Sequence, residues 1–178
     1  VEFIRSSHSI PDACMLAIHT PAGVVVHTGD FKVDYTPIDG QIIDFARLAE
    51  LGSKGVLALL ADSTNSERKG FTLSEKSIGP VFDSLFEGCK KRIVVATFAS
   101  NVHRVQQIVN SAVKFGRKIA VSGRSMINMI NSARELNYID APDNLFIDID
   151  NIKNPPSNFY LKSMMRIGDE EKFELYFV

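Results

Sequence analysis

Short apolar runs that end in turn residues alternate along the chain with amphipathic stretches. This pattern is typical of strands and helices that alternate around a largely parallel sheet, so the predicted fold class is α/β. The N-terminal part differs, because two strand-like runs, 13–19 and 24–28, are separated only by a short stretch that contains Pro21 and Gly23. Proline presets φ and glycine permits positive φ, so these two runs are predicted to form an antiparallel hairpin.

Two further elements are predicted before a change in character of the chain. Apolar residues at near-helical spacing predict a helix over 42–51 that ends at Gly52. The continuous apolar run 55–61 is typical of a strand buried on both faces. We place a domain boundary in the polar stretch 62–70, since the residues on its two sides follow different patterns.

The chain beyond this boundary alternates more regularly. The T-x-x-E pattern from Thr72 to Glu75 predicts a capping box that opens a helix to about residue 87. Strands and helices are then predicted in turn over 92–97, 101–115, 118–122, 125–136 and 145–149. This order predicts a Rossmann-like series of crossovers around a mainly parallel sheet. No G-x-G-x-x-G follows a predicted strand, which argues against a dinucleotide-binding domain.

The amino-acid composition limits the kinds of binding partner and cellular location that the sequence predicts. The 178 residues carry 20 Lys and Arg against 21 Asp and Glu, so bulk charge does not predict a polybasic nucleic-acid coat. Cys14 and Cys89 lie far apart in sequence and are predicted to be buried and inert. No apolar run reaches the length of a membrane span, and we expect a cytoplasmic protein with no membrane partner. The start at Val1, inside a strand-like run, indicates part of a longer protein.

Three polar clusters follow apolar strands, and strand ends are where open α/β sheets bind ligands. They contain His8, Asp30 and Asp62, respectively. Imidazole and carboxylate groups suit Zn or Mn, so these side chains could converge on a divalent metal. From the residues alone, a loop histidine bonded to backbone and carboxylates that cap turns explain them as well. His19 and His27 flank the hairpin and are predicted to be structural.

Two predicted helix starts are candidate phosphate contacts, because free N–H groups and the helix dipole favour anions there. Ser100, Asn101, His103 and Arg104 lie at the first start. At the second, Arg124 is suited to a bidentate phosphate contact and Ser125 follows it. The alternative is ordinary N-capping by the two serines.

The exact sequences of these clusters and their order along the chain favour a functional interpretation over a structural one. SSHSIPDA, VVHTGDFK and LLADSTN occur in this order, and TFASNVHRVQQI and SGRSMINMINSARELNYID follow. Together they resemble motifs of the metallo-β-lactamase/β-CASP ribonucleases, most closely those of the bacterial ribonuclease J group. The resemblance implies a two-sheet αββα metallo-β-lactamase fold, present here in part, followed by a Rossmann-like β-CASP domain. It also implies two zinc ions that activate water to cut RNA.

The resemblance assigns roles to three residues. His8 matches a zinc ligand, Asp30 matches the carboxylate that bridges both metals, and Asp62 matches an acidic residue that orients a histidine near the leaving group. The family's H-x-H-x-D-H and HVSGHA-like segments are absent from this sequence. Because a metal needs three or four protein ligands, we expect this chain alone to bind no zinc pair and to be inactive.

The resemblance also predicts domains and function. Residues 1–62 are predicted to be part of the metallo-β-lactamase domain, 63–161 the β-CASP domain and 162–178 a segment returning to the former. The preferred hypothesis is part of a zinc-dependent ribonuclease that acts on RNA, and whether the full-length protein forms a homo-oligomer is left open. The alternatives are a β-CASP nuclease acting on DNA and a non-catalytic nucleic-acid-binding module. The family's glycine-rich loop is absent between Leu161 and Lys162, where we expect a chain break.

Overall fold

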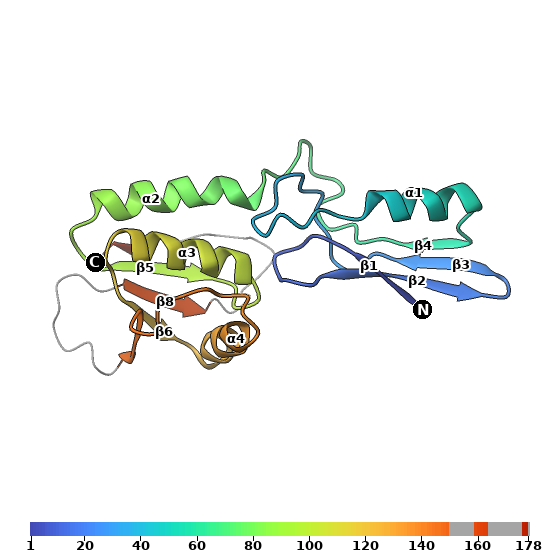
Figure 1. Ribbon diagram of the computed structural model, residues 1–178. Coiled ribbons are helices and arrows are strands. Elements are labelled where there is room, and N and C mark those ends of the chain that lie inside the picture. Colours follow the sequence, from blue (N-terminus) through green and yellow to red (C-terminus); the bar gives the residue numbers. More distant parts are fainter. Residues whose placement is uncertain (150–158, 164–175, 178) are drawn as a thin grey trace. The chain divides into compact units, whose positions relative to one another are not determined.

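A computed structural model describes residues 1–149, 159–163 and 176–177, the last two ranges by their backbone (Figure 1). The chain divides into two compact units, Val1–Lys76 and Ser77–Val178. Both units combine helices with a sheet, which confirms the α/β class. The predicted segment 162–178 lies largely outside the described residues.

The first unit is a four-stranded sheet with one helix. The sheet order is β1-β2-β3-β4, and α1 lies along one side of it (Figure 1). β2 and β3 pair antiparallel, which confirms the predicted hairpin, whereas β3 and β4 pair in parallel. The elements are β1 (Glu2–Arg5), β2 (Cys14–Thr20), β3 (Gly23–His27), α1 (Phe45–Lys54) and β4 (Ala58–Leu60).

The helix α1 starts and ends three residues later than predicted. The Asp44 side chain accepts a hydrogen bond of 3.0 Å from the Arg47 N–H and so caps the helix at this point. Ile43, which the pattern placed in the helix, instead precedes it and is 2% exposed in the core. Gly52 lies inside the helix, and Gly55, with φ of 93°, ends it.

The prediction of a strand buried on both faces over 55–61 is wrong. The strand β4 pairs only with β3 and forms the edge of the sheet. Leu57, Leu59 and Leu60 are 61%, 63% and 52% exposed. Val1, just before β1, and Phe3 on β1 are also exposed. The first unit therefore leaves much of its apolar sheet surface uncovered, because α1 packs on one side only.

A network of charged side chains ties the start of β1 to α1. Arg47 donates to Glu2 through Nε at 2.5 Å and through Nη2 at 2.9 Å, and it also pairs with Glu50. His19 on β2 contacts the same Glu2 carboxylate at 3.0 Å. The hydrogen bond from Arg47, followed by that from His19, lowers the pKa of Glu2 to about 2.

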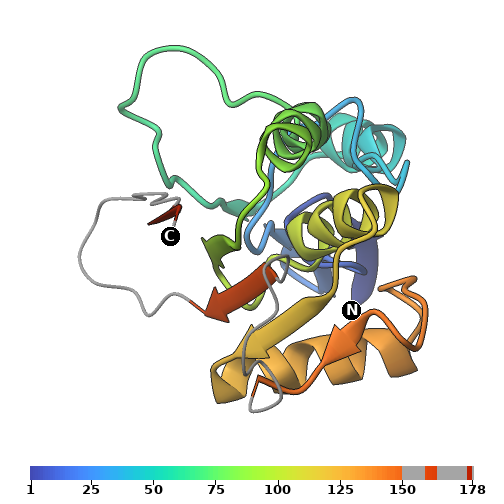
Figure 2. The same ribbon diagram turned by 90° about the vertical axis from the view of Figure 1, so that its left-hand side faces the viewer.

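The second unit is a three-layer α/β arrangement. Its sheet has the order β7-β6-β8-β5-β9, and all neighbours pair in parallel except β5 and β9. Figures 1 and 2 show α2 and α3 on one face of the sheet and α4 on the other. The elements are α2 (Ile78–Gly88), β5 (Ile93–Thr97), α3 (Val102–Lys114), β6 (Ile119–Ser122), α4 (Arg124–Glu135), β7 (Phe146–Ile147), β8 (Phe159–Ser163) and β9 (Tyr176–Phe177).

The predicted helix start at Thr72 is wrong. A short 3-10 turn, Glu75–Ser77, precedes α2, which begins at Ile78. The Glu75 N–H donates to the Asp34 carboxylate at 3.2 Å, so this segment is held by the first unit instead of by a capping box. Pro80 lies in the first turn of α2, where a missing N–H costs nothing.

The strand β8 is inserted between β5 and β6, which the local pattern did not predict. Its residues Leu161 and Lys162 pair in unbroken parallel register with Val95 and Ala96 of β5. The chain break expected at this junction is therefore contradicted. The Asn-Pro-Pro sequence at 154–156, which predicts a break in secondary structure, lies outside the described residues.

The core of the second unit is formed by the sheet and the three helices α2, α3 and α4. Ile93, Ile108 and Ile119 are fully buried in it. Arg117 is 8% exposed, donates to the carbonyl oxygens of Cys89 and Lys91, and so ties the start of β6 to the turn before β5.

Two predictions from composition can be compared with the structure. Cys14 is exposed, which contradicts its predicted burial, since it lies on the face of β2 opposite the core; Cys89 is half-buried. Among the described residues, no helix has the length and apolar character needed to cross a membrane.

We predict that Glu2→Gln lowers the free energy of unfolding at pH 7 and that this effect fades in acid. Because the folded-state pKa of Glu2 lies below its usual value of 4.5, at about 2, the stabilisation is complete above about pH 5. It is lost as pH falls through the folded-state pKa. Urea unfolding at pH 7, 5 and 3 measures it, with the exposed Glu67→Gln as control; a pH-independent difference would contradict the pairing.

Candidate functional site

Three strand-end loops of the first unit are joined by backbone hydrogen bonds. They are the loops after β1, β3 and β4, which contain His8, Asp30 and Asp62. The Lys32 N–H donates to the Ser7 carbonyl at 2.8 Å and joins the first loop to the second. The Phe31 N–H donates to the Asp62 carboxylate and joins the second to the third. The structure therefore brings the three sequence-predicted residues to one region.

Thr28 forms a second link between the β3 and β4 loops. Its hydroxyl donates to the Gly29 carbonyl at 2.7 Å and accepts from the Asp62 N–H at 2.9 Å. Its own N–H donates to the Leu60 carbonyl at 3.0 Å, which continues the parallel pairing of the strands. The side chain is 7% exposed. Sequence reasoning missed this residue, although a hydroxyl directly before a Gly-Asp pair at a strand end is a recognisable pattern.

The Asp62 carboxylate is held by its own turn. The side chain and backbone of Thr64 both donate to it, the N–H at 2.9 Å, and these bonds lower the pKa of Asp62. The Phe31 N–H and the nearby His8 act in the same direction, while partial burial opposes them. Asp62 is therefore an oriented, ionised side chain at neutral pH.

Asp30 differs from Asp62, because its side chain is exposed and makes no hydrogen bond or ion pair within the described part of the chain. His8 is half-buried, and its Nδ1 lies 3.3 Å from the Ser9 hydroxyl. The second ring nitrogen, Nε2, is therefore the one that could bind an external group. Of these two residues, Asp30 is the more accessible to a group from outside.

The described residues do not fit a metal centre by themselves. Across 1–149, no three His, Cys, Asp or Glu side chains lie close enough to hold a metal ion together. A zinc site needs three or four protein ligands, so the donor set of this chain is too small for the implied zinc pair.

The start of α3 uses its N–H groups within the chain. Asn101 is the N-cap, and its side chain accepts from the Arg104 N–H at 3.0 Å. The Val102 N–H donates to the Ser100 carbonyl at 3.0 Å. The alternative of capping by Ser100 is therefore wrong, since Asn101 performs this role. His103 and Arg104 are half-buried and have partners in the chain.

The start of α4, unlike that of α3, has no capping bond from the side chain of its N-cap residue. Its N-cap is Gly123, with φ of 102° and no side-chain capping bond, so capping by Ser125 is also wrong. Arg124 and Ser125 are the first helical residues, and both are exposed. Gly123 has no side chain that could accept the first N–H groups of the helix, and a helix start of this kind suits an external anion.

Strand register places both helix starts at one edge of the sheet. Lys162 of β8 pairs with Ala96 of β5 on one side and with Ser122 of β6 on the other. Because β5 and β6 are both parallel to β8, their carboxyl ends reach the same level, from which α3 and α4 begin. The two predicted phosphate-contact segments therefore share this edge.

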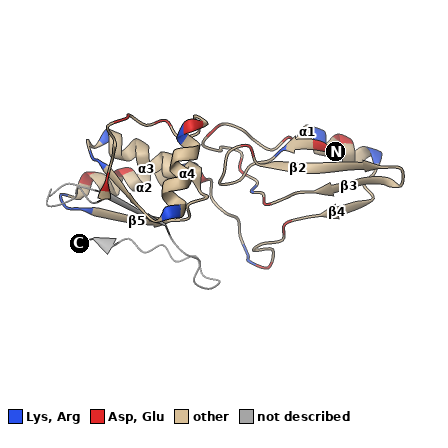
Figure 3. Ribbon diagram, turned by 90° about the horizontal axis from the view of Figure 1, so that it is seen from below, with Lys and Arg blue, Asp and Glu red and all other residues tan. Residues whose placement is uncertain are grey.

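Charge is mixed on both units. Figure 3 shows Lys and Arg interspersed with Asp and Glu along the ribbons. This agrees with the formal net charge of −1 and favours local contacts with an anionic partner over a broad basic face.

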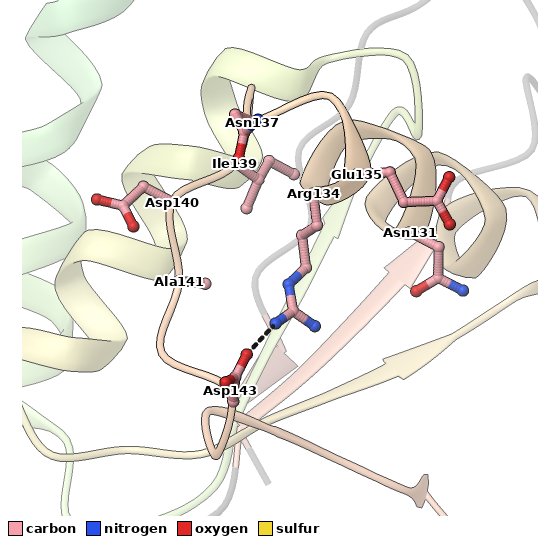
Figure 4. Close-up of a pocket in the computed structure, with 8 residues that line it drawn as sticks. All are labelled: Asn131, Arg134, Glu135, Asn137, Ile139, Asp140, Ala141 and Asp143. Atoms are coloured by element: carbon pink, nitrogen blue, oxygen red, sulfur yellow. Dashed lines mark hydrogen bonds and ion pairs between the residues drawn. The ribbon is translucent and has the colours of Figure 1, made fainter.

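A hollow of about 700 Å³ lies at the opposite end of α4 and contains none of the predicted residues. It is lined by Asn131, Arg134, Glu135, Asn137, Ile139, Asp140, Ala141 and Asp143. Figure 4 shows the Arg134 guanidinium directed at Asp143, and the two form an ion pair of 3.1 Å. Since 11 residues of helix separate Arg124 from Glu135, the hollow is about 16 Å from the first turn of α4. Its three carboxylates disfavour phosphate.

Comparison with known proteins points to one family. The sequence profile of "Ribonuclease J, beta-CASP domain" matches residues 90–162. Over 156 residues the chain is 56% identical to Ribonuclease J of Synechocystis sp., which covers 88% of this chain and 24% of the relative. Ribonuclease J of Helicobacter pylori is 49% identical over 158 residues, covering 89% and 23%, and that of Thermus thermophilus is 44% identical, covering 89% and 27%.

The chain thus spans about a quarter of the length of these relatives. A crystal structure of a protein of unknown function from Enterococcus faecalis has a similar fold, with a TM-score of 0.61 at 17% identity, and covers 92% of this chain and 41% of its own. The identities of 44–56% along nearly the whole chain and the profile match over 90–162 confirm the resemblance that the sequence motifs indicate. The chain therefore belongs to the ribonuclease J family of β-CASP proteins.

Proposed function

We propose that this chain is part of a ribonuclease that hydrolyses RNA phosphodiester bonds, and that it supplies one side of the active site. The observation that carries the proposal is the hydrogen-bonded junction of the loops that hold His8, Asp30 and Asp62. In this proposal His8 and Asp30 are ligands of zinc, which polarises phosphate oxygens and activates water when bound. Asp62 orients a histidine from elsewhere in the complete protein.

The different surroundings of the two aspartates support this division of roles. Asp62 is fixed by hydrogen bonds from Thr64 and Phe31, as an orienting group must be. Asp30 is exposed and retains its oxygen lone pairs for external groups. Because the donor set of this chain is too small for a zinc pair, the remaining ligands must come from other segments of the complete protein.

The uncovered apolar surface of the first unit supports its assignment, with residues 1–62, to part of a metallo-β-lactamase domain. Exposed Phe3 and Leu60, which the strand register places on the sheet face away from α1, would be costly to leave in water, at about 25 cal/mol per Å². A second sheet packed on this surface would bury them. Residues 63–161 are assigned to the β-CASP domain, in agreement with the profile match over 90–162.

The second unit is proposed to contact the RNA backbone at the shared start of α3 and α4. Arg124 is the strongest candidate, because it is exposed beside a glycine-capped helix start. Ser125 adds a hydroxyl, while Ser100, Asn101, His103 and Arg104 contribute from α3. Two or three phosphate contacts give weak, salt-sensitive affinity, so the complete protein must supply further contacts.

A non-catalytic nucleic-acid-binding module is the second candidate for the chain in isolation. The small donor set among the described residues favours it. The next experiment separates this behaviour from that of the complete protein.

We expect the isolated chain to show no ribonuclease activity and no tight zinc binding, because only two of the proposed ligands are present. Titration calorimetry with zinc and a fluorescent-RNA cleavage assay measure both properties. Two high-affinity zinc sites in the isolated chain would overturn the proposed division of ligands.

In the complete ribonuclease, Asp30→Ala is expected to lower kcat by a factor of roughly 10³ or more, because a carboxylate proposed to hold zinc would be lost. Single-turnover cleavage and metal analysis by mass spectrometry measure this loss. Asp39→Ala, which removes an exposed carboxylate from a turn of the same unit, is the control. Wild-type turnover by Asp30→Ala would refute its proposed role.

Arg124→Ala is expected to weaken binding of single-stranded RNA and leave metal content unchanged. Losing one phosphate contact should reduce the slope of log Kd against log salt by about 0.7. Fluorescence anisotropy at several salt concentrations measures the slope. Lys90→Ala, an exposed cation before β5 and so at the other edge of the sheet, is the control and should leave the slope unchanged. Equal slopes in both variants would exclude Arg124 from the contact.

A further inference from the structure

We propose that Thr28 is a positioning residue whose hydroxyl sets the Asp30 loop against the Asp62 loop. The inference rests on the proposed function, because it assumes that these two aspartates act at one site. It assigns a role to a side chain that need not contact RNA or metal itself.

The Thr28 hydroxyl both donates and accepts a hydrogen bond, one with each of the two loops. As a donor it bonds to the Gly29 carbonyl at 2.7 Å, directly before Asp30. As an acceptor it receives the Asp62 N–H at 2.9 Å. The same atom therefore fixes the backbone on which each aspartate is carried.

The turn that leads to Asp30 has little freedom to compensate for loss of this hydroxyl. Gly29 has φ of 57°, and a Cβ at this position would lie 3.3 Å from the Cys14 carbonyl oxygen. Its N–H is bonded to the His27 ring at 3.0 Å. Glycine is required here by both conformation and space, so the hydroxyl of Thr28 is the side-chain group that orients the Gly29 carbonyl.

Because Thr28 is buried, its two hydrogen-bond partners depend on its own hydroxyl. At 7% exposure, water has little access to replace it. Thr28→Val keeps the branched shape but leaves the Asp62 N–H and the Gly29 carbonyl without these partners. Thr28→Ser keeps the hydroxyl and loses only a methyl group, so it should restore what valine removes.

In the complete ribonuclease, we expect Thr28→Val to lower kcat by about 10- to 100-fold, as losses of residues that orient catalytic ligands do, and to change KM by less than about twofold. Thr28→Ser should retain kcat within about threefold. Thr28→Ala serves as a second hydroxyl-free variant if valine prevents folding, which circular dichroism checks.

Thr20→Val is a matched control. Its hydroxyl also donates to a carbonyl, that of Gly23 at 2.8 Å, and accepts a backbone N–H, that of Ala22 at 3.2 Å. It lies at the hairpin turn at the other end of β2 and β3. A loss of kcat at Thr28 and not at Thr20 separates positioning from the general cost of removing a threonine hydroxyl.

Amide hydrogen exchange of Asp62, followed by NMR in the 178-residue chain, gives a readout independent of cleavage. Exchange should accelerate at least about tenfold in Thr28→Val and remain unchanged in Thr28→Ser. Wild-type kcat and wild-type exchange in Thr28→Val, with an inactive Asp30→Ala, would overturn the positioning role alone. Wild-type cleavage by Asp30→Ala would instead refute the proposed function.

Discussion

Parallel strand pairing is the constraint on which both units depend. In the first unit, β3 and β4 run in the same direction, so the loops that follow them emerge at one edge of the sheet. In the second, β5 and β6 are both parallel to β8, so α3 and α4 begin from one edge. Each candidate site is thus formed by chain segments that strand direction places together.

The two units differ in how fully helices cover the faces of their sheets. The second unit has helices on both faces of its sheet, and its core residues Ile93, Ile108 and Ile119 are fully enclosed. The first has one helix and an exposed apolar surface around Phe3 and Leu60. Its exposed ion pairs add little, since such pairs contribute about 0–1 kcal/mol. The first unit therefore has more to gain from packing against further chain.

Within the first unit, hydrogen bonds distinguish side chains that hold position from side chains that remain accessible. Asp34 and Asp62 accept backbone N–H groups and fix the loops around them. Asp30, in contrast, is exposed. This contrast is the physical basis for assigning orientation to Asp62 and external binding to Asp30, with Thr28 linking the two.

The sequence alone predicts the α/β class, the β2–β3 hairpin and the family, because local periodicity, turn residues and sequence motifs are properties of neighbouring residues. It misplaced the ends of α1 and the start of α2, since Asp44 and Asp34 act through contacts that a one-dimensional pattern does not distinguish. The exposed edge position of β4 and the place of β8 between β5 and β6 follow from the three-dimensional fold, because burial and strand order depend on distant partners. The role of Thr28 belongs to the same class, because its hydroxyl accepts the N–H of a residue 34 positions away in sequence.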